Sequence, residues 1–339
     1  MCGSGGPASV HRVTGRGAAD GLTNYEGYSI GGGRERVRRP VRRTPLFEAQ
    51  HSERYGRQEL IADYQRAFDA NLIVVIDQIV ADAVTYLEEL LYDLDTDRPL
   101  HVLLASPGGD GEVALRMVRA MHLRCTELTV IVPDQAKSAA TLLCLGADRI
   151  LMGPAGDLGP VDPQLPGDTE WSLVSCKDLV RAVDEAEARV TRAPDAYPLF
   201  ASLLADVSMV RLEQARSAID RSESLVREAL ACAGSRTAAD VEALTGRLRG
   251  PLIDDPATHS AVISAPAARR HGLPVELADP ASDQWRLIWS LWVRYVHLGC
   301  FPVGQSSVYE GQRASHVMQP TVETLAAPAT PADLLDCAI

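Results

Sequence analysis

Residues 102–109 read VLLASPGG and residues 128–141 read LTVIVPDQAKSAAT, and these two stretches decide the fold. Each begins as an apolar run and then changes to small residues, which is the pattern of a buried strand that ends in a turn. The residues after each turn have the pattern of a helix. Two strand–turn–helix units in succession predict βαβ connections and a largely parallel sheet.

The same alternation continues on both sides of these stretches. We expect strands over residues 72–76, 101–105, 128–132 and 148–152, and helices over 51–68, 79–94, 112–123 and from Ser138 onward. Residues 173–248 differ from the rest because they are acidic and helical with no strand pattern, and we expect helices over about 173–191, 199–232 and 237–248, with Thr237 as an N-cap. The predicted fold class is therefore α/β with an inserted helical segment.

The chain is predicted to have four parts. Residues 1–45, rich in Gly and Arg, are predicted to be a disordered basic tail, and residues 46–280 the folded domain, with the helical insertion at 172–249. Residues 281–302 carry three tryptophans at helical spacing, which predicts a helix that packs on its own domain or on a sister subunit. Residues 303–339 are rich in Ser, Pro and Ala and are predicted to be a flexible tail.

The charge of the chain is unevenly distributed. The net charge is -12, whereas residues 1–45 hold eight Arg and three acidic residues, a net +5, so the remainder carries -17. An acidic body argues against general binding of nucleic acid. For the basic run at 34–43 we expect a solvated tail, and the alternative is contact with nucleic acid or an acidic partner.

Cysteine usage and hydropathy indicate a cytoplasmic protein. The seven cysteines are scattered and form no Cys-x-x-Cys pair, which is typical of a reduced protein with buried thiols and predicts no zinc site. The N-terminal residues have no apolar core of a signal peptide, and no run of about 18 apolar residues predicts a membrane span. No phosphate loop or dinucleotide fingerprint is present, so we expect no cofactor and no metal.

The first turn offers backbone donors for an oxyanion. Gly108 and Gly109 lack side chains, so the backbone can approach a substrate closely. Preorganised N–H groups stabilise the charge of a tetrahedral intermediate by roughly 2.7–4 kcal/mol per donor. The alternative interpretation is a plain turn between a strand and a helix.

The second turn offers a nucleophile. Ser138 stands at the start of a helix of small residues, and the N–H of Ala139 is a natural second oxyanion donor. Taken alone, a serine in this position is more often a simple N-cap, so the alternative is a structural role. The combination of Ser138 with the glycine turn favours acyl-transfer chemistry.

Three residues are candidates for the groups that activate Ser138. Lys137, one of only two lysines in the chain, is a candidate general base or a contact for a substrate carboxylate or a backbone carbonyl. His259 lies in a polar turn before a predicted strand and is a second candidate base. Asp162 lies in a Pro-rich turn and is a third candidate. The sequence leaves structural roles open for all three.

Three motifs in a fixed order resemble a known family. They are SPGGD at 106–110, PDQAKSAATL at 133–142 and LGPVDPQ at 158–164, and the phrases RYGRQ at 54–58 and THS at 258–260 add to them. Together they resemble the serine dehydrogenase proteinase family, which belongs with signal peptide peptidase A and the Clp protease proteolytic subunit in the ClpP/crotonase fold. The resemblance covers about residues 46–280.

The resemblance implies a ClpP/crotonase-like spiral of βαβ units. It implies Ser138 as nucleophile, oxyanion donors from Gly108 or Gly109 and from Ala139, and self-assembly into a homo-oligomer. Two features depart from the relatives. The Clp subunit has a histidine soon after the nucleophile where this chain has Asp162, so a Ser–Lys or Ser–His variant is needed; and Ala140 stands where the family often has glycine.

The sequence therefore predicts a serine peptidase that hydrolyses peptide or protein substrates through an acyl-enzyme on Ser138. The first alternative is an assembly protein that keeps the fold but lacks an efficient base. A lesser alternative is a crotonase-type acyl-CoA enzyme, which uses the same kind of backbone oxyanion hole.

Overall fold

The computed structural model describes residues 44–167 and 173–320. The chain divides into two compact units, residues 1–45 and 46–339. The predicted N-terminal tail lies outside the described residues, except for its last two positions, and the following description concerns the second unit.

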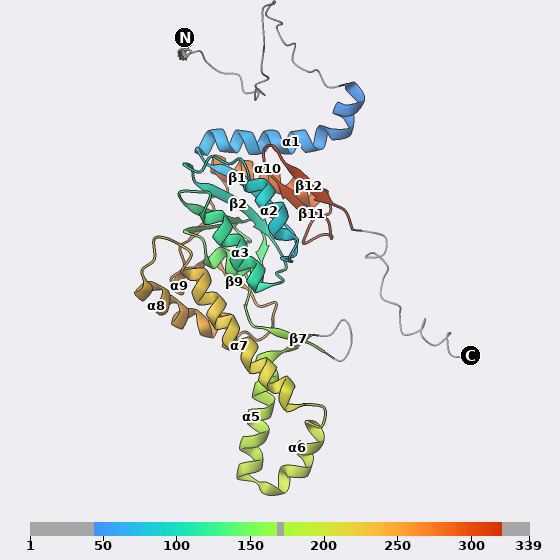
Figure 1. Cartoon of the computed structure of the whole chain (residues 1–339), viewed down its shortest axis with the longest axis vertical. Coiled ribbons are helices and arrows are strands. Elements are labelled where there is room, and N and C mark those ends of the chain that lie inside the picture. The colour runs from blue at the N-terminus through green and yellow to red at the C-terminus, as the bar shows by residue number, and fades with distance from the viewer. Residues whose placement is uncertain (1–43, 168–172, 321–339) are drawn as a thin grey trace, which may run out of the picture. The chain divides into compact units, whose positions relative to one another are not determined.

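The main sheet of this unit has seven strands. Figure 1 shows this sheet with helices packed around it. Its strand order is β10-β5-β3-β2-β1-β11-β12. The strands are β1 (Asn71–Ile76), β2 (Leu100–Ala105), β3 (Leu128–Val132), β5 (Arg149–Met152), β10 (Val275–Leu277), β11 (Ser307–Glu310) and β12 (Ser315–Met318). From β10 to β1 all neighbours are parallel, whereas β11 and β12 are antiparallel. The predicted α/β class is confirmed, and the four predicted strands of the core are present.

Alternate residues of the buried strands face two separate apolar layers. In β1, Ile73 and Val75 belong to one layer and Leu72 and Val74 to the other. The first layer packs against α2 (Ala83–Leu91), α3 (Gly111–His122) and α4 (Ala139–Leu145), and the second against α1 (Pro45–Phe68) and α10 (Asp283–His297). Because both faces are covered, the strands are mostly apolar, as parallel strands usually are.

The Trp-bearing helix packs on its own domain. Trp285 and Trp292 in α10 are 5% and 4% exposed and belong to the apolar layer shared with α1, while Trp289 is 48% exposed. Of the two predicted arrangements, packing on its own domain or on a sister subunit, the structure shows the first.

Short strands outside the main sheet carry the turns of interest. A three-stranded sheet consists of β4 (Gln135–Ala136), β6 (Asp157–Leu158) and β9 (Ile263–Ser264), and a hairpin consists of β7 (Gln164–Pro166) and β8 (Leu173–Ser175). At two or three residues each, these strands are too short to leave a periodic pattern in the sequence. Their hydrogen bonds nevertheless fix the loops that follow β3 and β5.

The predicted helical insertion lies between β8 and β9 in the chain, and Figure 1 labels its helices α5, α6, α7 and α8. It contains α5 (Cys176–Arg192), the 3-10 helix η1 (Pro194–Ala196), α6 (Tyr197–Leu203), α7 (Met209–Leu230), α8 (Ala238–Arg249) and the π-helix η2 (Gly250–Asp254), and α9 (Ala265–Arg270) follows β9. The helix predicted over 199–232 is two helices, because the chain breaks after α6 and Ser208 caps α7. Thr237 caps α8 in a capping box with Asp240.

The C-terminal tail predicted from residue 303 differs from the structure, since β11 and β12 extend the main sheet there. The buried carboxylate of Glu310 in β11 accepts hydrogen bonds from Arg57 in α1, at 2.7 and 3.1 Å, and from the Tyr295 hydroxyl, at 2.6 Å. A glutamate in a short run does not predict a buried strand, because its burial depends on a cation far away in the sequence. Residues 321–339 lie outside the described residues.

We expect His101 in β2 to make the protein sensitive to acid. Its side chain accepts or donates a 2.7 Å hydrogen bond with the Tyr64 hydroxyl, and burial, with the nearby Arg149, lowers the pKa of this imidazole from about 6.5 to about 4. Between these values the unfolded chain takes up a proton that the folded chain does not, so stability falls as the pH falls from 6.5 to 4, by about 3 kcal/mol. Denaturant unfolding at several pH values checks this, and His101→Gln should flatten the dependence. Equal losses in both proteins would show that His101 is not the cause.

Candidate active site

The turn at 106–109 and the turn at 135–138 lie against each other at the C-terminal ends of β2 and β3. The N–H of Ser106 donates to the Gln135 carbonyl, and the N–H of Lys137 donates to the Ser106 carbonyl, both at 3.0 Å. Ser106 and Ala136 thus form a parallel bridge that joins the turn after β2 to the turn after β3. The glycines and Ser138 are therefore placed together by backbone hydrogen bonds.

Both glycines of the first turn have left-handed backbone conformations, with φ of 107° at Gly108 and 140° at Gly109. A Cβ on Gly108 would lie 2.6 Å from the Cβ of Ser138, and one on Gly109 would lie 2.2 Å from the Ile79 carbonyl oxygen. Both positions therefore need glycine for conformation and for space. Gly108 is the residue that packs directly on Ser138.

Two of the three backbone N–H groups predicted to bind an oxyanion are free within the described part of the chain. The N–H of Gly108 donates to the Ser106 hydroxyl at 3.0 Å, so it is already used. The N–H groups of Gly109 and Ala139 have no hydrogen-bond partner within residues 44–167 and 173–320. Of the three predicted oxyanion donors, Gly109 and Ala139 are thus available to a ligand in this conformation.

Ser138 has a strained backbone and is not a capping residue. Its φ and ψ are 51° and -117°, and its side chain makes no capping hydrogen bond to α4. The N-cap role that its position alone favours is therefore absent. A non-glycine residue in this region costs on the order of 1–3 kcal/mol and is found mostly at functional sites, as in the nucleophile elbow of hydrolases.

The buried hydroxyl of Thr141 helps to hold this turn. It donates to the Ala136 carbonyl at 2.9 Å and accepts the N–H of Gly159 at 3.1 Å. The loop after β6 is thereby attached to the first turn of α4. That loop continues into Asp162.

Asp162 and His259 form a hydrogen-bonded pair although they are far apart in the sequence. His259 Nδ1 lies 2.9 Å from Asp162 Oδ1, and the side chains are 33% and 1% exposed, respectively. An ionised carboxylate only accepts, so the shared proton belongs to Nδ1 and leaves Nε2 unprotonated in a neutral ring. Nε2 has no partner among the described residues, and it is the atom that can accept a proton.

One cleft brings these groups together. Its volume is about 570 Å³, and its lining includes Gly109, Ser138, Ala139, Asp162 and His259. Leu142 of α4 and Ala218 and Leu225 of α7 add an apolar wall, so the insertion forms one side of the cleft. The cleft therefore contains a hydroxyl, a paired imidazole and two free N–H groups.

Lys137 is not part of this lining. Its ammonium forms an ion pair with Asp157 Oδ1 at 2.5 Å, and both side chains are largely buried, at 12% and 14% exposed. A Cβ on Gly159 would lie 2.6 Å from Lys137 Cδ, so the lysine stem runs beneath the loop after β6. The structure therefore separates Lys137 from the cleft that holds Ser138.

The other lysine lies beside the acid–histidine pair, and no motif around it in the sequence predicts a role for it. Lys177 of α5 is 7% exposed; its Nζ lies 3.7 Å from Asp162 Oδ2 and donates to the Pro256 carbonyl. It connects the insertion both to Asp162 and to the loop that carries His259. The one feature of the sequence that draws attention to Lys177 is the scarcity of lysine. The chain has 31 arginines and two lysines, and both lysines form buried ion pairs.

Comparison with known proteins finds a family model that matches one segment of the chain. Residues 72–192 match the model of the family described as ClpP-like SDH-type serine proteinase. The fold is thus ClpP-like, as predicted, and this segment is similar to the ClpP-like serine proteinases. The resemblance to the serine dehydrogenase proteinase family is confirmed over the matched residues.

The individual proteins that are similar to this chain match only part of it. Two uncharacterized proteins of Methanocaldococcus jannaschii are similar: MJ0137 is 36% identical over 92 residues, and MJ1495 is 35% identical over 69 residues. These matches cover 27% and 20% of this chain, and they span 30% and 24% of the length of those relatives. Among solved structures, a mutant of the 1510-N membrane-bound stomatin-specific protease aligns with a TM-score of 0.39 and 15% identity, over 61% of this chain and 78% of that one. No helix within the described residues is both long enough and apolar enough to span a membrane.

Proposed function

We propose that this protein is a serine peptidase in which Ser138 is the nucleophile, His259 the general base and Asp162 the group that orients His259. Gly109 and Ala139 supply the oxyanion hole. The observation that carries the proposal is the hydrogen-bonded Asp162–His259 pair in the same cleft as the strained Ser138. The pair supplies the histidine that the chain lacks directly after the nucleophile.

The proposed reaction follows the general logic of a serine, a histidine and an acid. The Ser138 Oγ attacks the carbonyl carbon of the peptide, and its proton moves to His259 Nε2. The N–H groups of Gly109 and Ala139 hold the negative charge on the carbonyl oxygen. His259 then gives the proton to the leaving amine, and water enters to hydrolyse the ester on Ser138 by the same steps.

Asp162 supports this reaction through its charge and its fixed position. It is almost fully buried and accepts from His259 Nδ1, which selects the tautomer with a basic Nε2. When His259 becomes an imidazolium, the carboxylate stabilises that charge. Lys177 keeps Asp162 in place and is a positioning residue rather than a catalytic one.

In this proposal the substrate is a peptide or an unfolded protein segment, and the protein associates with copies of itself. The exposed apolar side chains of the insertion favour self-association: Leu199 and Leu203 of α6 are 60% and 67% exposed, and Met209 and Val210 of α7 are 68% and 69% exposed. The alternative of an inactive assembly protein rests on a missing base, and His259 supplies a candidate for it. No feature of the described residues favours acyl-CoA chemistry.

A fluorophosphonate probe tests the proposal, because it forms a covalent adduct only with an activated serine. We expect mass spectrometry to locate one adduct on Ser138 and expect Ser138→Ala to abolish the labelling. Ser52→Ala is a useful control, because Ser52 is an exposed serine of α1 that does not line the cleft. Labelling that persists in Ser138→Ala, or a folded wild-type protein that does not react, would contradict the proposal.

A further inference from the structure

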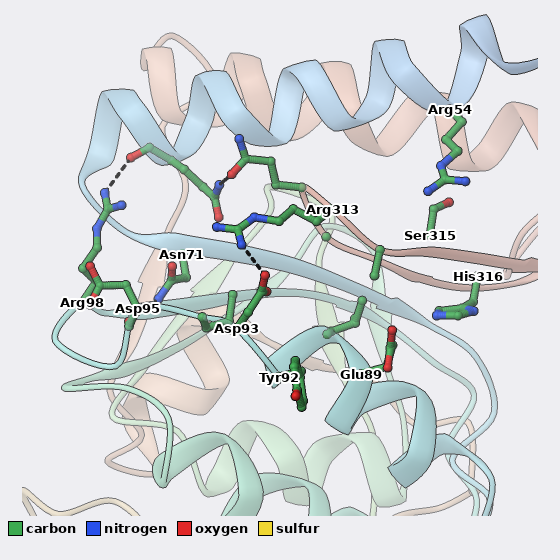
Figure 2. Close-up of a pocket in the computed structure, with 16 residues that line it drawn as sticks. Arg54, Asn71, Glu89, Tyr92, Asp93, Asp95, Arg98, Arg313, Ser315 and His316 are labelled. Carbon is green, nitrogen blue, oxygen red and sulfur yellow. Dashed lines mark hydrogen bonds and ion pairs between the residues drawn. The ribbon is translucent and has the colours of Figure 1, made fainter. Parts of the chain in front are cut away.

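A second cavity lies at the opposite edge of the main sheet, where β1 and β2 begin. Figure 2 shows this cavity between α1, the end of α2 and the β11–β12 turn. Its volume is about 620 Å³, and none of the residues of the Ser138 cleft contributes to its lining. A ligand here would therefore not compete with a peptide at Ser138.

One wall of the cavity is held rigidly. Arg57, Gln58 and Gln65 of α1 all bond to the hairpin: Arg57 to Glu310, Gln58 to the Gly311 carbonyl at 3.3 Å and Gln65 to Gln312 at 2.8 Å. The phrase RYGRQ at 54–58 thus attaches α1 to β11 and β12. Ser315 is held as well, because its hydroxyl donates to Glu310 at 2.6 Å.

Arg54 belongs to the same helix and makes no such contact. Its guanidinium has no hydrogen bond or ion pair to any residue that the structure describes, and its Nε is shielded from solvent without an acceptor. In Figure 2 the Arg54 side chain points from α1 toward Ser315. A half-buried guanidinium with no acceptor beside a cavity is a place for an oxyanion.

Two other cavity residues each have one nitrogen without a partner, although Arg98 also donates through its Nη2 to the Gln65 carbonyl and to Asp69. His316 Nε2 and Arg98 Nε are also enclosed atoms without a hydrogen-bond partner in the described chain. Buried polar nitrogens are normally satisfied. The two guanidinium nitrogens need acceptors, and His316 Nε2 needs one in the tautomer that carries its proton there, so the three nitrogens suit a ligand rich in acceptor oxygens.

The acidic residues of the lining limit the chemistry of that ligand. Asp93 pairs with Arg313 across the cavity, but the carboxylate of Glu89 has no partner among the described residues. Glu89 lies below Arg54 in Figure 2. Arg54 and Glu89 are thus opposite charges that face the same space without pairing, which suits a ligand with an oxyanion at one end and donor groups at the other.

We propose that this cavity binds a small polar metabolite through a carboxylate or phosphate group held by Arg54 and His316. The ammonium or hydroxyl groups of the same molecule donate to Glu89. A carboxylate and a phosphate share the chemistry that Arg54 recognises, and the choice of probes separates them.

Isothermal titration calorimetry on the full chain tests this site, with inorganic phosphate, L-glutamate and O-phospho-L-serine as probes at matched ionic strength. We expect saturable binding of at least one probe and expect Arg54→Gln to weaken it roughly ten- to hundredfold, since a hydrogen bond to a charged group is lost. Arg66→Gln is the matched control, because Arg66 is in the same helix but pairs with Asp63 at the surface. Glu89→Gln should weaken the two aminated probes and leave inorganic phosphate unaffected.

Each outcome bears on the proposal. Binding of phosphate without L-glutamate selects a phosphate ligand, and the reverse selects a carboxylate. The proposal is overturned if none of the probes binds saturably, or if Arg54→Gln and Arg66→Gln bind as the wild type does. These measurements do not use peptidase activity, so the failure of one proposal leaves the other intact.

Discussion

Replacing His259 with glutamine is expected to slow the acylation of Ser138 by roughly 10³- to 10⁴-fold. Glutamine keeps a polar side chain next to Asp162 but cannot accept the Ser138 proton. In the wild type, Asp162 holds His259 by a 2.9 Å hydrogen bond, and Nε2 is free to act. A rate loss of this size, with unchanged thermal unfolding, would identify His259 as the base.

The measurement is the rate of fluorophosphonate labelling under pseudo-first-order conditions, with Lys137→Met beside it. Lys137 pairs with Asp157 outside the cleft, so we expect this variant to keep most of its labelling rate once it is shown to be folded. The reverse result, in which Lys137→Met loses labelling and His259→Gln keeps it, would assign the base to Lys137 and refute the Ser138–His259–Asp162 arrangement.

Replacing Lys177 with methionine should lower both the stability of the protein and the rate of acylation at Ser138. Lys177 is the ammonium closest to the buried Asp162 carboxylate, at 3.7 Å, and it also holds the loop before His259 through the Pro256 carbonyl. Removing one partner of a buried ion pair costs about 3–5 kcal/mol, because the other charge stays buried without compensation. We expect that loss in denaturant unfolding, together with slower acylation.

Arg181→Met is the matched control for Lys177. Arg181 lies one turn further along α5 and also donates to this loop, at the Asp254 carbonyl, but it is exposed and does not contact Asp162. It should therefore change stability and labelling little. In a positioning role, Lys177→Met lowers kcat with little change in KM, and Lys177→Arg recovers part of the rate. If Lys177→Met and Arg181→Met behave alike, Lys177 does not position the pair.

The main sheet could be predicted because its strands are long, apolar and followed by turns of small residues. Residues 128–132 match β3 in full, and the turn to helix α4 begins at Ser138 as expected. The strands β11 and β12 could not be predicted, because they are short and the burial of Glu310 in β11 depends on Arg57. A contact across most of the chain leaves no local periodicity.

The nucleophile and the glycine turn could also be proposed from sequence, because each is a local motif. The distinction between Gly108 and Gly109 could not, because it depends on a hydrogen bond from Gly108 to the Ser106 hydroxyl. Asp162 and His259 were separate candidates whose pairing needs the fold. The sequence singles out Lys137 because it adjoins Ser138, whereas the structure places Lys177 rather than Lys137 beside Asp162. Adjacency along the chain does not bring a side chain into the same cleft.

The placement of Asp162 before the helical insertion and of His259 after it affects when the site is complete during synthesis. A growing chain that ends after α4 has Ser138 and both backbone donors but none of the groups that we propose to remove a proton. Asp162 is made next, yet its partner emerges only after α5, α7 and α8 have been translated. On the proposed mechanism the nascent protein cannot cleave itself or its neighbours on the ribosome until His259, which follows the insertion, has been synthesised and has paired with Asp162.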